Sequence, residues 1–164
     1  MQPFCCATNY LPETHVIQEY CNMAITCKEV PFGSETYKTL LTIRYEVLRK
    51  PLGWELREKD IANDHNEFHL AAFDDGKAIG CVLLKPLSKT TIQLRQMAIM
   101  DSHRGKNIGA ELVRFAEEFV QKQGFTNIET RARKTAEGFY QKLGYTSHAD
   151  EFEDEHTLKM SKLL

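Results

Sequence analysis

The sequence predicts one α/β domain in which a mixed, mostly antiparallel central sheet is flanked by helices. Segments with β periodicity are joined by short turns in the middle of the chain, which indicates an antiparallel meander. Segments with one apolar helical face separate the other strands. A length of 164 residues suits one domain with a sizeable core. We expect about six to seven strands and about four helices.

The first elements are predicted to be a strand and a helix. Residues 24–30 are typical of a short strand, which Pro31 ends. Ser34 is suited to cap a helix that stops at Pro51. The apolar positions of this helix are Tyr37, Leu40, Leu41, Val47 and Leu48. The charged residues 54–63 are predicted to form a short helix or a lid-like loop.

The meander occupies residues 68–100. Residues 68–73 and 77–85 are predicted strands around an Asp74-Asp75-Gly76 turn, and residues 91–100 form the third strand. Strict alternation in this third strand puts Ile92, Leu94, Gln96 and Ala98 on one face. It puts Gln93, Arg95, Met97 and Ile99 on the other face.

The last third of the chain alternates helices and strands. One clean helical face is formed by Ile108, Leu112, Phe115, Ala116, Phe119 and Val120. Residues 127–132 are a predicted strand, 135–143 a short helix, and 145–147 with 157–160 a closing hairpin. The domain is expected to span residues 23–164, with residues 1–22 as an N-terminal extension. Met23 directly precedes the first strand, so we hypothesise that the native chain starts there.

Composition excludes several classes of protein. The formal net charge of −2 argues against nucleic-acid binding through a general basic field. The five cysteines are odd in number and lack C-x-x-C spacing, which favours a reducing, cytoplasmic location over a disulfide framework. No stretch has the length of a membrane span, so no membrane partner is expected. His65 and His69 have a metal-ligand spacing only in a helix, and a strand is predicted there, so no metal site is expected.

The stretch HRGKNIGAELVRFAEE, residues 103–118, predicts an anion site. It follows a strand and opens a helix, whose first N–H groups lack internal partners. Gly105 and Gly109 have no Cβ to obstruct a ligand, and Arg104 and Lys106 add positive charge. The residue types and spacing fit neither a Walker loop nor a dinucleotide fingerprint. A basic helix start without a ligand is an equally good interpretation of this stretch alone.

A second stretch, RARKTAEGFYQKLGY at residues 131–145, makes the pair of motifs more specific. Together they resemble the GNAT superfamily of acyl-CoA-dependent N-acetyltransferases over roughly residues 24–162. The phosphate loop of that family, Arg/Gln-x-x-Gly-x-Gly/Ala, matches Arg104, Asn107 and Gly109. Its later motif matches Ala136, Phe139, Tyr140, Lys142, Gly144 and Tyr145.

The resemblance implies transfer of an acetyl group from acetyl-CoA to a primary amine by direct attack in a ternary complex. The acceptor is a small molecule or a peptide, and a homodimer is an open alternative to a monomer. Tyr140 is expected to protonate the leaving thiolate, although helical spacing alone favours a core aromatic. The expected cofactor-binding residues are Met97, Ala98, Ile99, Arg104, Gly105, Lys106, Asn107, Ile108, Gly109, Arg133, Ala136, Phe139 and Lys142.

The sequence departs from the family at two positions. Asn107 replaces the usual glycine, but Asn tolerates a left-handed backbone better than other side chains. Arg133 replaces an Asn that contacts the pantetheine arm in many members.

The general base is not identified by the sequence. Residues 91–100 contain no acidic side chain, where many relatives have a Glu. The candidates are His69, His156, Glu67, or a water chain through Gln93 or Gln96, and both histidines have a structural interpretation as well. His69 and His156 match a subset of the family.

Two further interpretations concern the function as a whole. The acidic residues within 150–155 either form a solvated loop or attract a cationic acceptor. A non-catalytic acyl-CoA-binding or regulatory module is the alternative function, and a different phosphate-binding protein is disfavoured.

Overall fold

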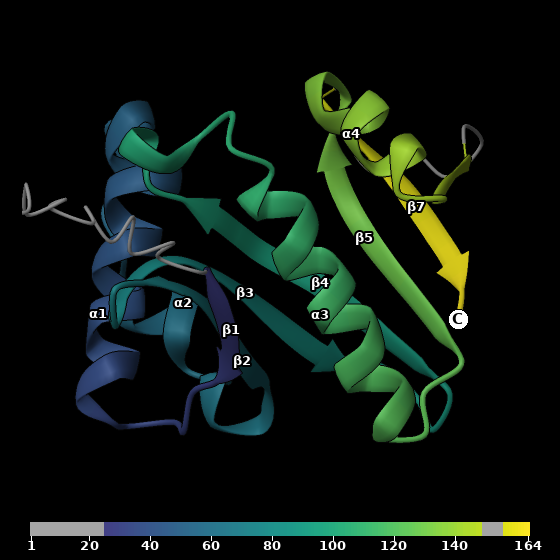
Figure 1. Ribbon diagram of the computed structural model, residues 1–164, viewed down its shortest axis with the longest axis horizontal. Helices are drawn as coiled ribbons and strands as arrows, with labels where there is room; N and C mark the ends of the chain where they lie inside the picture. Colours follow the sequence, from purple (N-terminus) through teal and green to yellow (C-terminus); the bar gives the residue numbers. More distant parts are fainter. Residues whose placement is uncertain (1–24, 149–155) are drawn as a thin grey trace, which may run out of the picture.

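The computed structural model describes residues 25–148 and 156–164. Within these residues, seven strands form one sheet in the order β1-β2-β3-β4-β5-β7-β6, and only the β4–β5 pair is parallel (Figure 1). The predicted fold class is therefore confirmed. The predicted extension of residues 1–22 and the acidic loop of residues 150–155 lie outside the described residues, so both predictions remain untested.

The element order agrees with the sequence prediction. The strands are β1 (Thr26–Glu29), β2 (Phe68–Asp74), β3 (Lys77–Pro86), β4 (Thr91–Ile99), β5 (Asn127–Arg133), β6 (Thr146–His148) and β7 (Thr157–Leu163). The α-helices are α1 (Glu35–Arg44), α2 (Glu58–Ile61), α3 (Ile108–Lys122) and α4 (Glu137–Lys142). Among the described residues, no helix is long and apolar enough to cross a membrane.

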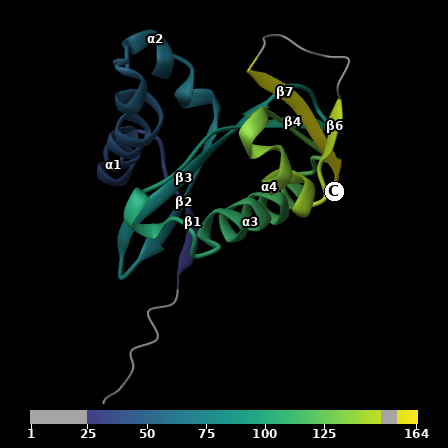
Figure 2. The same cartoon turned by 90° about the horizontal axis from the view of Figure 1, so that it is seen from above.

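Helices cover both faces of the sheet, and each face has its own apolar core. Helix α1 lies on one face and helices α3 and α4 on the other (Figure 2). Ile108, Leu112 and Val120 of α3 pack against Leu70, Ile92 and other strand residues in the larger core. Tyr37, Leu40 and Ile43 of α1 pack against the opposite face with the small side chains Ala71, Cys81 and Ala98.

Helix α1 ends in an unusual turn. Ser34 caps its start as predicted, because the Ser34 hydroxyl accepts the Tyr37 N–H at 3.1 Å. After Arg44 the backbone continues as a π-helical turn, Tyr45–Arg49, which the sequence did not predict. Such turns occur frequently at functional sites because the inserted residue redirects the side chains around it.

Strand β4 contains a bulge, and the predicted strict alternation of its side chains is wrong beyond this point. Arg95 pairs with Leu83 and Ala98 with Cys81, so two β4 residues, Gln96 and Met97, lie opposite one β3 residue. The bulge residue Gln96 has a φ of +52°. Ile92 and Leu94 pack in the larger core, whereas Ala98, four residues after Leu94, packs in the smaller one.

Strands β4 and β5 separate along their length. They pair from Thr91 to Leu94 on β4 and from Asn127 to Thr130 on β5, and the register ends there. Their carboxyl ends diverge with the start of α3 between them (Figure 1). This separation opens the sheet directly beside the bulge.

Candidate active site

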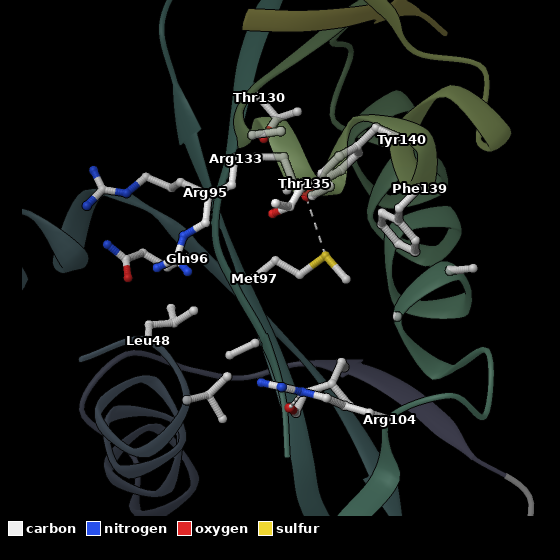
Figure 3. A pocket seen from close by; sticks show the side chains of 18 of the residues that line it. Leu48, Arg95, Gln96, Met97, Arg104, Thr130, Arg133, Thr135, Phe139 and Tyr140 are labelled. Atoms are coloured by element: carbon white, nitrogen blue, oxygen red, sulfur yellow. Dashed lines mark hydrogen bonds between the residues drawn. The ribbon is translucent and has the colours of Figure 1, made fainter. Parts of the chain in front are cut away.

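A cavity of about 800 Å³ occupies the space where β4 and β5 diverge. Its walls come from β4, β5, the loop before α3, the α4 segment and the π-helical turn (Figure 3). The lining side chains include Met97, Thr130, Thr135, Phe139 and Tyr140. The parallel pairing of β4 and β5 brings the residues that follow both strands to this one edge of the sheet.

The loop before α3 lines one end of the cavity. Gly105 has a φ of +75° and Asn107 a φ of +63°, so the prediction that Asn107 tolerates a left-handed backbone fits the observed geometry. Asn107 is the N-cap of α3, and its side chain makes no capping hydrogen bond. The Ala110 N–H donates to the Asn107 carbonyl, whereas the N–H groups of Ile108 and Gly109 have no backbone acceptor among the described residues. These two groups are available for an anion at the positive end of a 15-residue helix.

Gly109 allows α3 to approach the strand and α4 closely. A Cβ atom at this position would lie 2.9 Å from Met97 Cε and 3.7 Å from Phe139 Cζ. Arg104 is held at the end of β4, because its Nε donates to the Ile99 carbonyl at 3.3 Å and its Nη2 lies 3.0 Å from Asp101 Oδ1. A positive charge is thereby fixed beside the open helix end.

Tyr140 lies on the opposite wall of the cavity. Its ring packs edge-on against Phe139 at 5.0 Å and Tyr145 at 5.3 Å between centroids. Its O–H donates to Met97 Sδ at 3.6 Å (Figure 3). Burial raises the pKa of Tyr140 above its usual value, so the phenol is protonated at neutral pH.

The bulge divides the side chains of β4 between two sides. The side chains of Arg95 and Gln96 point away from Tyr140, whereas Met97 points towards it (Figure 3). The Gln96 carbonyl accepts the Cys81 S–H at 3.9 Å. A residue other than glycine whose backbone is left-handed stores strain, and such strain clusters at functional sites.

The structure brings most of the predicted site residues to this cavity. The lining includes Met97, Ala98, Ile99, Arg104, Gly105, Asn107, Ile108, Gly109, Arg133, Ala136, Phe139 and Tyr140. Lys106 and Lys142 are not among the lining residues. The roles assigned to all of these residues stay predictions.

The two predicted histidines lie away from the cavity lining. His69 is buried on the α1 side of the sheet, where its Nε2 lies 2.8 Å from the Asp64 carbonyl oxygen and its ring packs edge-on against Tyr37. His156 is exposed just before β7, and its carbonyl accepts the Lys134 N–H at 3.0 Å. A base role for either histidine stays a prediction.

Several lining residues were missed by the sequence analysis. Val47, Leu48 and Arg49 come from the π-helical turn, and Arg95 directly precedes the bulge. No residue pattern marks this turn in the sequence, because adjacent apolar pairs such as Val47-Leu48 also occur in the regular helices α1 and α3. A single sequence offers no signal for the bulge either, because Gln96 is not a glycine.

Comparison with known proteins identifies the family. Residues 34–145 match the model of the acetyltransferase (GNAT) family, and the chain belongs to this family. The uncharacterized N-acetyltransferase YitI of Bacillus subtilis is 29% identical over 119 residues, which cover 68% of this chain and 78% of YitI.

Solved structures share the fold at low sequence identity. A protein of Lactobacillus plantarum named as a candidate N-acetyltransferase has a TM-score of 0.76 and 20% identity over 86% of this chain and 99% of its own. The PaiA N-acetyltransferase of Thermoplasma acidophilum, solved in complex with coenzyme A, has a TM-score of 0.67 and 20% identity. That match covers 87% of this chain and all of PaiA, 100%.

Proposed function

We propose that the protein transfers an acetyl group from acetyl-CoA to a primary amine of a small molecule or peptide. One observation carries this proposal. The β4–β5 divergence creates a cavity that joins a bare helix start, a strand bulge and a buried tyrosine. Family membership supports acetyl transfer, and the coenzyme A complex of PaiA supports an acyl-CoA donor.

The residues at the cavity fit coenzyme A. A diphosphate needs several hydrogen-bond donors and a positive charge at close range, and the N–H groups at the start of α3 with Arg104 supply both. Gly105 leaves open space at this surface, and Gly109 lets the start of α3 lie close to Met97 and Phe139. Ala136, Phe139 and Arg133 would contact the rest of the cofactor.

The chain supplies two groups to the reaction in this proposal. A backbone N–H of β4, at Met97 or a neighbour, polarises the thioester carbonyl as the amine attacks it. Tyr140 gives its proton to the sulfur as the carbon–sulfur bond breaks, since its raised pKa keeps it protonated. The amine attacks directly, so no acetylated side chain forms.

A non-catalytic acyl-CoA-binding module is the second candidate. It is favoured by the lack of an acidic side chain on β4, since deprotonation of the amine must precede attack. The two functions differ in turnover, not in cofactor binding.

A free-thiol assay with acetyl-CoA and a panel of amines tests the proposal. We expect thiol release only when an acceptor amine is present. Binding of acetyl-CoA by calorimetry without thiol release from any amine would favour the module instead. A cytoplasmic location and a homodimer stay predictions, and size-exclusion chromatography with light scattering would test the second.

A further inference from the structure

A second, smaller cavity of about 150 Å³ adjoins the first. Arg49, Arg95 and Gln96 line both cavities, so the two spaces meet at the β4 bulge. The described residues that line the smaller cavity are all polar or charged, and they are Arg49, Lys59, Asp60, Asn63, Asp64, Glu67, Arg95 and Gln96. Two of its lining side chains, Arg95 and Gln96, point away from Tyr140 (Figure 3).

Glu67 lines this cavity and lacks a hydrogen-bond donor for one of its carboxylate oxygens. Its side chain is only 2% exposed, and its Oε1 accepts from Arg95 Nη1 at 3.3 Å. Its Oε2 is buried and has no hydrogen-bond partner in the part of the chain that the structure describes. A buried carboxylate oxygen without a donor is costly, so it indicates a site where a ligand supplies that donor.

The cations of the cavity are also incompletely paired. Asp64 pairs with Arg44, Asp60 with Arg57, and Glu67 with Arg95. Within the described residues, neither Arg49 nor Lys59 has a carboxylate within 4 Å, the limit for an ion pair. Arg49 is half-buried at the junction of the two cavities, where an anionic group of a ligand would form an ion pair with its guanidinium.

We propose that the smaller cavity is the acceptor subsite, where Glu67 takes the proton of the acceptor amine and Arg49 binds an anionic group on the same acceptor. This proposal rests on the proposed acetyltransferase function. The acceptor is then a small primary amine that also carries a carboxylate or phosphate. The amine enters the junction at the bulge, beside the position proposed for the thioester.

The proton balance of the reaction follows from this arrangement. The ammonium group gives one proton to Glu67, and its freed electron pair forms the carbon–nitrogen bond to the acetyl group. The carbon–sulfur bond breaks, Tyr140 protonates the sulfur, and the second nitrogen proton restores Tyr140. Glu67 then releases its proton to water, which leaves an acetamide, free coenzyme A and one proton.

The electrostatics of Glu67 suit a proton acceptor. Burial raises the pKa of Glu67, while the nearby charge of Arg95 lowers it in part. Asp64, Lys85 and His69 also act electrostatically on this carboxylate, with Asp64 raising its pKa and the other two lowering it. A carboxylate with a raised pKa is a stronger base than a solvated one, which brings it closer to the task of accepting a proton near neutral pH.

The variant Glu67→Gln separates catalysis from folding. Because folding raises the pKa of Glu67, its protonated form is the stabilising one, and this stability is lost as pH rises through the folded pKa. We therefore expect Glu67→Gln to be at least as stable as the wild type at pH 7, with the difference closing in acid. Arg95 is 29% exposed and remains solvated in this variant.

Turnover and acetyl-CoA affinity give the decisive comparison for Glu67. We expect Glu67→Gln to lower kcat by about 100-fold, the scale for loss of a positioned base, with acetyl-CoA binding unchanged by calorimetry. The acidic limb of the pH–rate profile should disappear. Glu118→Gln, at an exposed carboxylate on α3, is the matched control and should keep wild-type turnover. A Glu67→Gln enzyme with wild-type kcat and an unchanged acidic limb would overturn the base role.

Paired acceptors test the anionic part of the subsite. Each pair consists of an amine with a carboxylate or phosphate and its neutral analogue, assayed with the wild type, Arg49→Gln and the control Arg114→Gln. We expect a kcat/KM preference of at least about tenfold for the anionic partner, the scale of one charge-assisted hydrogen bond, that is lost only in Arg49→Gln. Equal loss for both partners, or a wild-type preference for the neutral one, would overturn the assignment. If the wild type binds acetyl-CoA but releases no thiol with any amine, the proposed acetyltransferase function is wrong, and so is the acceptor subsite that depends on it.

Discussion

Replacement of Tyr140 by Phe should separate the chemical role of its hydroxyl from the packing of its ring. The ring contacts with Phe139 and Tyr145 do not involve the hydroxyl, so they persist in Tyr140→Phe. The hydroxyl donates to a thioether sulfur at 3.6 Å, which is a weak acceptor. Loss of this contact should cost less than about 1 kcal/mol of the free energy of unfolding.

The effect on catalysis should be much larger than the effect on stability. Loss of a positioned acid lowers kcat by about 100-fold, which corresponds to about 2.7 kcal/mol of the activation barrier. The protonated phenol is the active form, so the wild-type rate should fall only above the usual Tyr pKa, since burial raises the pKa of Tyr140. This alkaline limb should be absent or moved in the variant.

The assay is thiol release under conditions where chemistry limits the rate. Tyr145→Phe is the matched control, because Tyr145 is a buried tyrosine of the same core and does not line the cavity. If Tyr140→Phe turns over like the wild type and like the control, Tyr140 is a core aromatic and the proton comes from another group.

Three further predictions test other parts of the structure. Arg104→Ala should weaken acetyl-CoA binding in calorimetry by about tenfold, and the control Arg114→Ala should weaken it less. Added salt should also weaken binding of acetyl-CoA to the wild type. Equal effects of the two variants would contradict a phosphate-binding role for Arg104. Gln96→Gly should raise the free energy of unfolding by up to about 1 kcal/mol, because glycine adopts a left-handed backbone without strain. The control Gln93→Gly on the same strand should lower this free energy by about 0.5–1 kcal/mol. Urea unfolding measures both, and a lower free energy of unfolding in both variants would argue against strain at the bulge. Arg44→Ala should lower the same free energy by about 3–5 kcal/mol, since it leaves a buried carboxylate without its cation, and a loss below about 1 kcal/mol would contradict that pairing.

The element order was predictable because periodicity and turn residues act locally. The one-face pattern from Ile108 to Val120 led directly to α3, and Asp74-Asp75-Gly76 marked the tight β2–β3 turn. The place of the loop before α3 at the cavity was predictable for the same reason, because its glycines, Arg104 and the helix start are contiguous in the chain.

The acceptor side of the site depends on contacts that are distant in sequence. Glu67 and Arg95 are 28 residues apart, and Arg49 reaches the same cavity through a π-helical turn. The bulge that orients the Gln96 side chain depends on the register of β4 against β3. No single residue in the sequence indicates this register. Alternation was therefore extended through β4, and the prediction for Ala98 was wrong.

His69 illustrates how a residue type is compatible with two roles. The sequence made it a candidate base, yet its Nε2 lies within hydrogen-bond distance of the Asp64 carbonyl oxygen, beside a buried Arg44–Asp64 pair. This placement favours a structural role, and a base role remains a prediction that His69→Gln would test through the acidic limb of the pH–rate profile.

Direct transfer in a ternary complex is tested most directly by mass spectrometry with a parallel thiol count. The protein is mixed with acetyl-CoA, first alone and then with an acceptor amine found in the panel. Direct transfer predicts no acetylated protein and no thiol without the amine, and equal amounts of thiol and N-acetylated amine with it. An acetylated protein that forms without the amine and then passes its acetyl group on, or acetyl-CoA binding with no product from any amine, would contradict it.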